Sequence, residues 1–167
     1  MKQISINFTS SKKLLPIGCW LIKAYMNTSY SHVALEYTTS RNKSLVYEAV
    51  GVGVRFISKE LWLQIAEIKE SYILNMSEDQ YNKVMDYCID HAGIRYGYLQ
   101  NLGIVLADLF NLKKNPFNGK EEVCSQMLGE VLLELGFVFN KSTELLTPKD
   151  IELALKMNNL FRKSGEE

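Results

Sequence analysis

The sequence predicts an α+β fold, and two observations carry this prediction. Alternating patterns of apolar residues, typical of strands, occupy most of the chain up to residue 76, and helical patterns follow from residue 77 onward. The strand segments are joined by short loops, which indicates an antiparallel sheet. A run of strands before a run of helices is typical of an α+β domain. We expect an antiparallel sheet of about four to six strands.

The strand patterns are short, and turn residues separate them. Ile4, Ile6 and Phe8 alternate along the first pattern, and Val33, Leu35 and Tyr37 form one face of a later strand pattern. The polar run between residues 38 and 43 reads as a hairpin loop. The expected strands cover residues 3–8, 30–37, 44–50, 52–56 and 67–74, and a helix that starts at Pro16 lies between the first two.

Helix start signals organise the second half of the chain. Residues 77–80 (Ser-Glu-Asp-Gln) form a capping box, and the helix that follows is expected to end at Gly93. A second helix is expected over residues 99–110. Thr147 and Pro148 provide a cap and a first helical residue for the last helix.

Composition places the chain in a broad class. The 167 residues suffice for one domain, residues 1–167, whose core needs no disulfide or metal to hold it. Lysine plus arginine equals aspartate plus glutamate, at 19 each, so no basic excess points to nucleic acid. Three widely spaced cysteines argue against a disulfide framework and favour a reduced, cytoplasmic protein.

Targeting and membrane signals are also weak. The first residues contain no apolar run fit for a signal peptide. The longest apolar stretch, residues 102–110, contains Asp108 and is too short to span a bilayer, so we expect no transmembrane segment. The tail from about residue 160 is expected to be frayed.

The candidate nucleophile is Cys124, in the first turn of a probable central helix. Residues 122–128 open a helix that is apolar nearly all round, which suits the middle of a domain, and Gly136 can take the left-handed position after it. The positive end of a helix favours an anion, so a thiol placed there is a candidate thiolate. The alternative is a small buried core residue, since free cysteine is often buried.

A cysteine nucleophile needs a base and a third group that orients the base. The chain has two histidines, and His91 follows Cys88 near a helix end. A cation there suits the helix dipole, which favours a solvated surface role for His91. Cys88 and His91 also offer two metal ligands, but two fall short of a complete set of four, and we expect no metal site and no cofactor.

His32 is the better candidate for the base, because it begins a strand that forms a hairpin with the strand of Glu48. If Leu35 pairs with Leu45, His32 lies directly opposite Glu48, with their Cβ atoms about 5 Å apart. A shift by two residues leaves Glu48 diagonal to His32. The alternative is a histidine at the strand edge beside a solvated glutamate. We expect the Cys124 helix to pack on the face of the sheet that carries His32.

Five short motifs in a fixed order resemble one known family. They are residues 31–34 (Ser-His-Val-Ala), 46–49 (Val-Tyr-Glu-Ala), 93–96 (Gly-Ile-Arg-Tyr), 123–126 (Val-Cys-Ser-Gln) and 147–150 (Thr-Pro-Lys-Asp). The order resembles the circularly permuted branch of the NlpC-like, papain-fold cysteine hydrolases, in which the histidine strands precede the cysteine helix. Lecithin:retinol acyltransferase and its relatives share this order.

The resemblance implies a permuted papain-like fold and four catalytic residues. Cys124 would be the nucleophile, His32 the base, Glu48 the orienting residue, and Tyr96 a side chain near the active site whose hydroxyl helps to hold the oxyanion. Two positions differ from the family pattern, because Gly97 and Gln126 stand where acidic residues are frequent.

Three hypotheses about function follow. The first is a cysteine hydrolase or acyltransferase that cleaves an amide, ester or thioester through an acyl-enzyme on Cys124, with a peptide or lipid-acyl substrate. The second is a non-catalytic protein of the same fold that binds a peptide or an acyl group. The third is a purely structural domain, which requires Cys124 and His32 to lie far apart.

Overall fold

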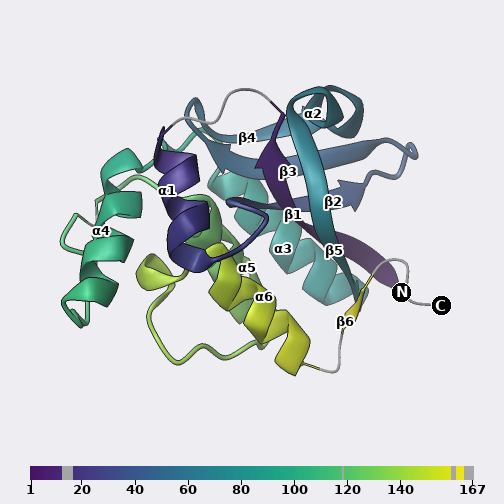
Figure 1. The fold of residues 1–167 in the computed structure, drawn as a ribbon. Helices are drawn as coiled ribbons and strands as arrows, with labels where there is room; N and C mark the ends of the chain where they lie inside the picture. The colour runs from purple at the N-terminus through teal and green to yellow at the C-terminus, as the bar shows by residue number, and fades with distance from the viewer. Residues whose placement is uncertain (13–16, 118, 159–160, 164–167) are drawn as a thin grey trace.

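The computed structural model describes residues 1–12, 17–117, 119–158 and 161–163, and the side chains of residues 17–21 and 161–163 are not among the described features. Figure 1 shows a sheet at one side of the molecule and most of the helices at the other. The elements in chain order are β1 (Lys2–Ser11), α1 (Ile17–Met26), β2 (His32–Thr38), β3 (Ser44–Val50), β4 (Gly53–Ser58), α2 (Lys59–Ile65), β5 (Ala66–Met76), α3 (Glu78–Asp90), α4 (Tyr98–Leu109), α5 (Cys124–Glu134), a 3₁₀ turn (Thr143–Leu145), α6 (Pro148–Met157) and β6 (Phe161–Lys163).

The sheet is antiparallel and confirms the predicted fold class. Its five main strands are ordered β4-β3-β2-β1-β5, and the three-residue strand β6 pairs with β5 at the edge. β1 is central because it pairs with both β2 and β5, and its alternating residues Ile4, Ile6 and Phe8 are buried as the pattern predicts. β2, β3 and β4 follow one another outward from β1. Because β2 and β3 are antiparallel, the start of β2 and the end of β3 lie at the same end of the sheet.

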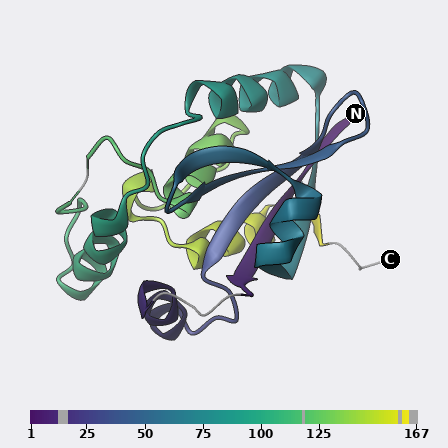
Figure 2. The same cartoon turned by 90° about the horizontal axis from the view of Figure 1, so that it is seen from above.

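Different helices cover the two faces of the sheet. Helices α3, α5 and α6 contribute to one hydrophobic cluster with Val33, Leu35 and Tyr47. Trp62 of α2 forms a second cluster with Ala34 and Val46 on the other face, and Figure 2 shows α2 and α3 on opposite sides of the strands. Because side chains alternate along a strand, the expectation that α5 covers the face carrying His32 is wrong. It packs on the face of the neighbouring residue Val33.

The helix start signals are confirmed, and one helix was not predicted. Ser77 and Gln80 form the capping box of α3, and Thr147 caps α6 with Pro148 in its first turn. Helix α2 has seven residues, too few for a clear helical period, and the sequence analysis assigned no element there. Its cap is Ser58, whose hydroxyl accepts a hydrogen bond from the backbone of Leu61. Pro16 lies outside the described residues, and so does the side chain of Cys19.

Helix α5 is the centre of the larger cluster, as its apolar sequence predicts. Its buried residues include Met127, Leu128, Val131 and Leu132. Gly129 allows the 3₁₀ turn to pack closely, because a Cβ atom there would lie 2.4 Å from the Leu146 side chain. Gly136 has a φ of +88°, which confirms the predicted left-handed position after the helix.

The C-terminal strand β6 lies at the edge of the sheet. Its residues Phe161–Lys163 pair with Tyr72, Ile73 and Leu74 of β5. Residues 164–167 of the predicted tail lie outside the described residues. In the part of the chain that the structure describes, no helix has the length and apolar character needed to cross a bilayer.

Candidate active site

Cys124, His32 and Glu48 come from three elements that meet at one end of the sheet. Cys124 is the first residue of α5, His32 is the first residue of β2, and Glu48 lies within β3. The segment just before α5 is held in place, because Glu122 forms a short parallel β-bridge with Tyr96. The Cys124 side chain at this helix end contacts His32 and the backbone N–H of Val33, which places the start of α5 next to the beginning of β2.

The register of the hairpin differs from the one that places His32 directly opposite Glu48. Leu35 pairs with Tyr47, not with Leu45. The same register, extended by one residue, places Glu48 opposite Ala34 and diagonal to His32. The side chains of His32 and Glu48 are nevertheless in contact, with 3.1 Å between His32 Nε2 and Glu48 Oε2. The predicted pairing is wrong by two residues, and the diagonal alternative is the one observed.

Glu48 is buried and holds four hydrogen bonds. Arg55, its partner across the β3–β4 pair, donates to Oε1 from Nη2 at 2.7 Å and from Nε at 3.1 Å. Trp62 Nε1 donates to Oε2 at 2.9 Å, beside the bond to His32. Burial raises the pKa of Glu48, but the hydrogen bond and charge of His32, with the hydrogen bonds from Arg55 and Trp62, outweigh it and lower the pKa to about 2. Glu48 is therefore an anion that fixes the orientation of the imidazole.

Arg55 and Trp62 also belong to this site, and the sequence patterns did not predict them. The register of β3 with β4 was not predicted, and α2 was not predicted at all, so no pattern placed either residue beside Glu48. One signal could have pointed to them: a buried glutamate requires hydrogen-bond donors, and these must come from the elements around it.

His32 connects the carboxylate to the thiol. Burial lowers the pKa of His32, but the charge of Cys124, a hydrogen bond with its sulfur, and the bond and charge of Glu48 together raise it to about 10. Because Nε2 contacts Glu48, Nδ1 is the nitrogen left for the sulfur. His32 is therefore a cation when Cys124 is a thiolate, and its two nitrogens serve two different anions.

Cys124 has the surroundings of a stabilised thiolate. Burial raises the pKa of Cys124, whereas the charge of His32, its hydrogen bond, and the backbone N–H groups of Val33 and Ser125 lower it, and the net direction is downward. The residue is only 4% exposed. Cys124 and His32 are thus in contact, and a structural domain in which they lie far apart is excluded.

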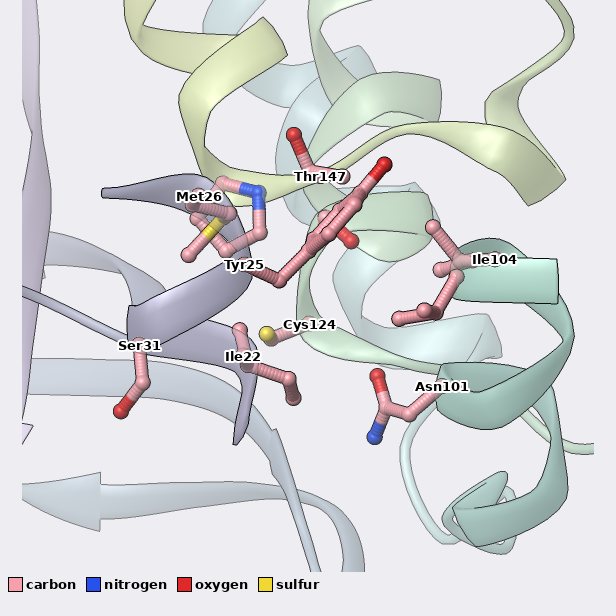
Figure 3. A pocket seen from close by; sticks show the side chains of 11 residues that line it. Ile22, Tyr25, Met26, Ser31, Asn101, Ile104, Cys124 and Thr147 are labelled. Atoms are coloured by element: carbon pink, nitrogen blue, oxygen red, sulfur yellow. The ribbon is translucent and has the colours of Figure 1, made fainter. Parts of the chain in front are cut away.

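The sulfur of Cys124 lies at the bottom of a small pocket between α1 and α4. Figure 3 shows it between Ile22 of α1 and Asn101 of α4, with Ser31 on the side of the sheet. The space measures about 330 Å³, part of it open to solvent. Most of the wall is apolar: Ile22, Tyr25, Met26, Ile104, Val105 and Pro148. Cys124 thus borders a small and largely apolar pocket.

Tyr96 lies near this pocket without lining it. Its hydroxyl accepts a hydrogen bond of 2.7 Å from the amide of Asn101, a pocket residue. Its backbone forms the bridge to Glu122, two residues before Cys124. The role in holding an oxyanion stays a prediction, and the observed contacts give Tyr96 a part in positioning Asn101 and the start of α5.

The other histidine does not have the surroundings expected for it. His91 caps the end of α3, but it is half-buried and its ring stacks on Tyr87 at 3.9 Å. Cys88 is fully buried in the larger cluster, and burial raises its pKa to about 12. The residues grouped with His91 are Glu122 and Glu130, and Cys88 is not part of this group.

Comparisons with known proteins add no identification. No protein-family model matches the chain, and no curated protein matches its sequence. The functional argument therefore depends on the geometry of the site.

The low pKa of Glu48 predicts a specific acid sensitivity. A carboxyl whose pKa is lowered by folding stabilises the protein fully above its usual value of about 4.5, and this contribution is lost as the pH falls toward about 2. The difference corresponds to about 3 kcal/mol. We expect the unfolding free energy of the wild type to fall by about this much more than that of Glu48→Gln between pH 5 and pH 2. Urea denaturation across this range measures it, and equal losses in the two proteins would show that Glu48 is not a stabilised anion.

Proposed function

We propose that the protein is a cysteine hydrolase or acyltransferase that forms an acyl-enzyme on Cys124. The observation that carries the proposal is the contact chain from Cys124 through His32 to Glu48 beneath an apolar pocket. Such a chain provides a nucleophile, a base and an orienting anion in one place. The substrate class that fits is an ester, thioester or amide whose acyl part is apolar, from a lipid or a peptide.

The chemical steps follow from the positions of the groups. The Cys124 thiolate attacks the substrate carbonyl carbon, a C–S bond forms, and the carbonyl oxygen becomes an oxyanion. Free backbone N–H groups at the start of a helix are the donors suited to that oxyanion. The His32 imidazolium then gives its proton to the leaving oxygen, sulfur or nitrogen as its bond to the carbonyl breaks. Neutral His32 next takes a proton from water, which attacks the thioester and releases the acid. An acceptor alcohol or amine in place of water gives acyl transfer.

The resemblance to the permuted NlpC-like branch belongs to the same proposal. It is supported by the order of the elements, because the strands that carry His32 and Glu48 precede the helix that carries Cys124. The neighbouring Arg55 and Trp62 support it as well, since they keep the third residue charged and buried.

Alkylation with iodoacetamide near pH 6.5 tests the nucleophile. We expect Cys124 to react at least about tenfold faster than Cys88, because the thiolate is the reactive form and the two thiols have pKa values shifted in opposite directions. His32→Ala should remove most of the difference. Peptide mass spectrometry locates the label on Cys124, Cys88 or Cys19. Equal, slow labelling of all three would contradict the proposal. Fast labelling without turnover of any ester or amide would favour the non-catalytic binding protein.

A further inference from the structure

A second cluster of chemistry-bearing side chains lies where α3 meets α5, apart from the triad. His91 ends α3, Glu122 lies in the segment before α5, and Glu130 lies within α5. One nitrogen or oxygen atom from each lies within 4.8 Å of the other two. Glu122 is buried, and the other two residues are half-buried. The cluster thus joins the end of α3 to α5 and the segment just before it, two regions that are distant in the sequence.

The imidazole of His91 is oriented as a ligand. Its Nδ1 lies 2.9 Å from the backbone carbonyl oxygen of Tyr87. A carbonyl only accepts, so Nδ1 carries the proton and the neutral ring presents a lone pair at Nε2. Nε2 faces Glu122 Oε1 at 3.8 Å, which is too long for a hydrogen bond. Two ligands that are each about 2.0 Å from a tetrahedral zinc ion lie about 3.3 Å apart, so the two side chains need to approach each other only slightly to share one ion.

Glu122 provides the observation that points to a bound cation. Its side chain is 8% exposed, and its Oε2 atom is buried without a hydrogen-bond partner among the described residues. Within the same described part of the chain, His91 is the basic side chain that forms an ion-pair contact with Glu122, and none does so with Glu130. A buried carboxylate oxygen without a partner is costly unless a cation or a proton satisfies it.

Glu130 is held in place by neutral donors. The hydroxyl of Tyr87 donates to Oε2 at 2.7 Å, and Gln126 Nε2 and Thr143 Oγ1 donate to Oε1 at 3.3 Å each. Tyr87 therefore supports two members of the cluster, through its carbonyl to His91 and its hydroxyl to Glu130. Outer partners of this kind orient the ligands of metal sites.

We propose that His91, Glu122 and Glu130 bind one divalent cation, and that the cation is Zn²⁺. One imidazole and two carboxylates form a set that zinc accepts, and a water molecule supplies the fourth ligand. The ion joins the end of α3 to α5 and to the residue two positions before Cys124. The backbone of that residue, Glu122, also pairs with Arg95 and Gly97. Zinc therefore stabilises the segment that positions the nucleophile.

The test uses untagged Cys124→Ala protein, because a thiolate beside an imidazole is itself a candidate zinc ligand pair. The protein is stripped with EDTA, loaded with Zn²⁺ and dialysed, and zinc is counted by elemental mass spectrometry and its affinity measured by calorimetry. We expect one zinc per chain and a higher melting temperature with zinc. In this background, His91→Ala and Glu130→Gln should each weaken zinc binding at least about tenfold, and Tyr87→Phe roughly tenfold or more.

The matched control is Glu134→Gln, an exposed glutamate one turn after Glu130 on the same helix, which should leave binding unchanged. Melts in EDTA show that each variant folds. The proposal is wrong if zinc stays below one per chain, or if His91→Ala and Glu130→Gln bind like the control. It is also wrong if zinc fails to bind while Glu122→Gln raises the melting temperature in EDTA, since Glu122 then holds a proton. None of these outcomes bears on the role of Cys124.

Discussion

We expect Cys124→Ala to form no acyl-enzyme and to keep its fold. The thiolate is the group that would form the covalent bond, and among the described residues Cys88, the other free cysteine, is fully buried with a raised pKa. The stability cost is small, about 1 kcal/mol, because the sulfur borders an existing pocket and its loss creates little new cavity. Intact-protein mass after incubation with activated esters of increasing acyl length measures the adduct, and a thermal melt measures stability.

Cys88→Ala is the matched control, because it removes the same atom from a position that is 0% exposed. This variant should form the adduct like the wild type and melt at a lower temperature than Cys124→Ala, since its sulfur leaves a closed cavity in the core. Persistence of the adduct in Cys124→Ala, or a melting temperature many degrees lower than that of Cys88→Ala, would mean that Cys124 is a core residue.

The parts of the fold that are determined locally could be predicted from the sequence. The capping residues Ser77 and Thr147 act within one helical turn, so their patterns are visible in four consecutive residues. The alternation of Ile4, Ile6 and Phe8 indicates which side of β1 is buried, whatever the neighbouring strands are. Cys124 and His32 could be chosen because few residue types act as nucleophile or base, and the chain has few cysteines and histidines.

Properties that depend on how strands align could not be predicted. A shift of two residues between β2 and β3 keeps every apolar side chain on the same face, so the pattern cannot separate the pair Leu35–Leu45 from the observed pair Leu35–Tyr47. For the same reason, the sequence gives no means to decide that Arg55 faces Glu48. The face of the sheet that α5 covers also depends on the other elements. Trp62 of the short helix α2 packs against the opposite face, and the sequence did not predict this helix.

The surroundings of His91 show a similar limit. A histidine at a helix end suits the dipole in solvent, and only the folded chain reveals that Glu122 and Glu130 meet it there. These residues are separated from it by 31 and 39 positions, and no local pattern connects segments so far apart.

Glu48→Ala is the variant with the largest expected effect on stability. It removes the shared acceptor of three donors and leaves the Trp62 N–H buried and the Arg55 charge without its partner. Removing one member of a buried ion pair costs about 3 kcal/mol or more. For a chain of this size we expect the melting temperature to fall by roughly 6–12 °C. Glu48→Gln should lose less, because its amide oxygen still accepts one of these bonds.

The alkylation rate of Cys124 separates the proposed catalytic role of Glu48 from its structural one. Without the carboxylate, His32 loses the acceptor that orients Nε2 and one of the two anions beside it, so Cys124 should be alkylated at least about tenfold more slowly in Glu48→Ala. Glu36→Ala is the control, because Glu36 is another buried glutamate of this hairpin, with its own ion pair to Lys59 and a hydrogen bond from Asn7. It should also lower the melting temperature, but it should leave the alkylation rate of Cys124 near that of the wild type. If both variants slow alkylation equally, loss of stability alone explains the effect, and Glu48 has no part in activating the thiol.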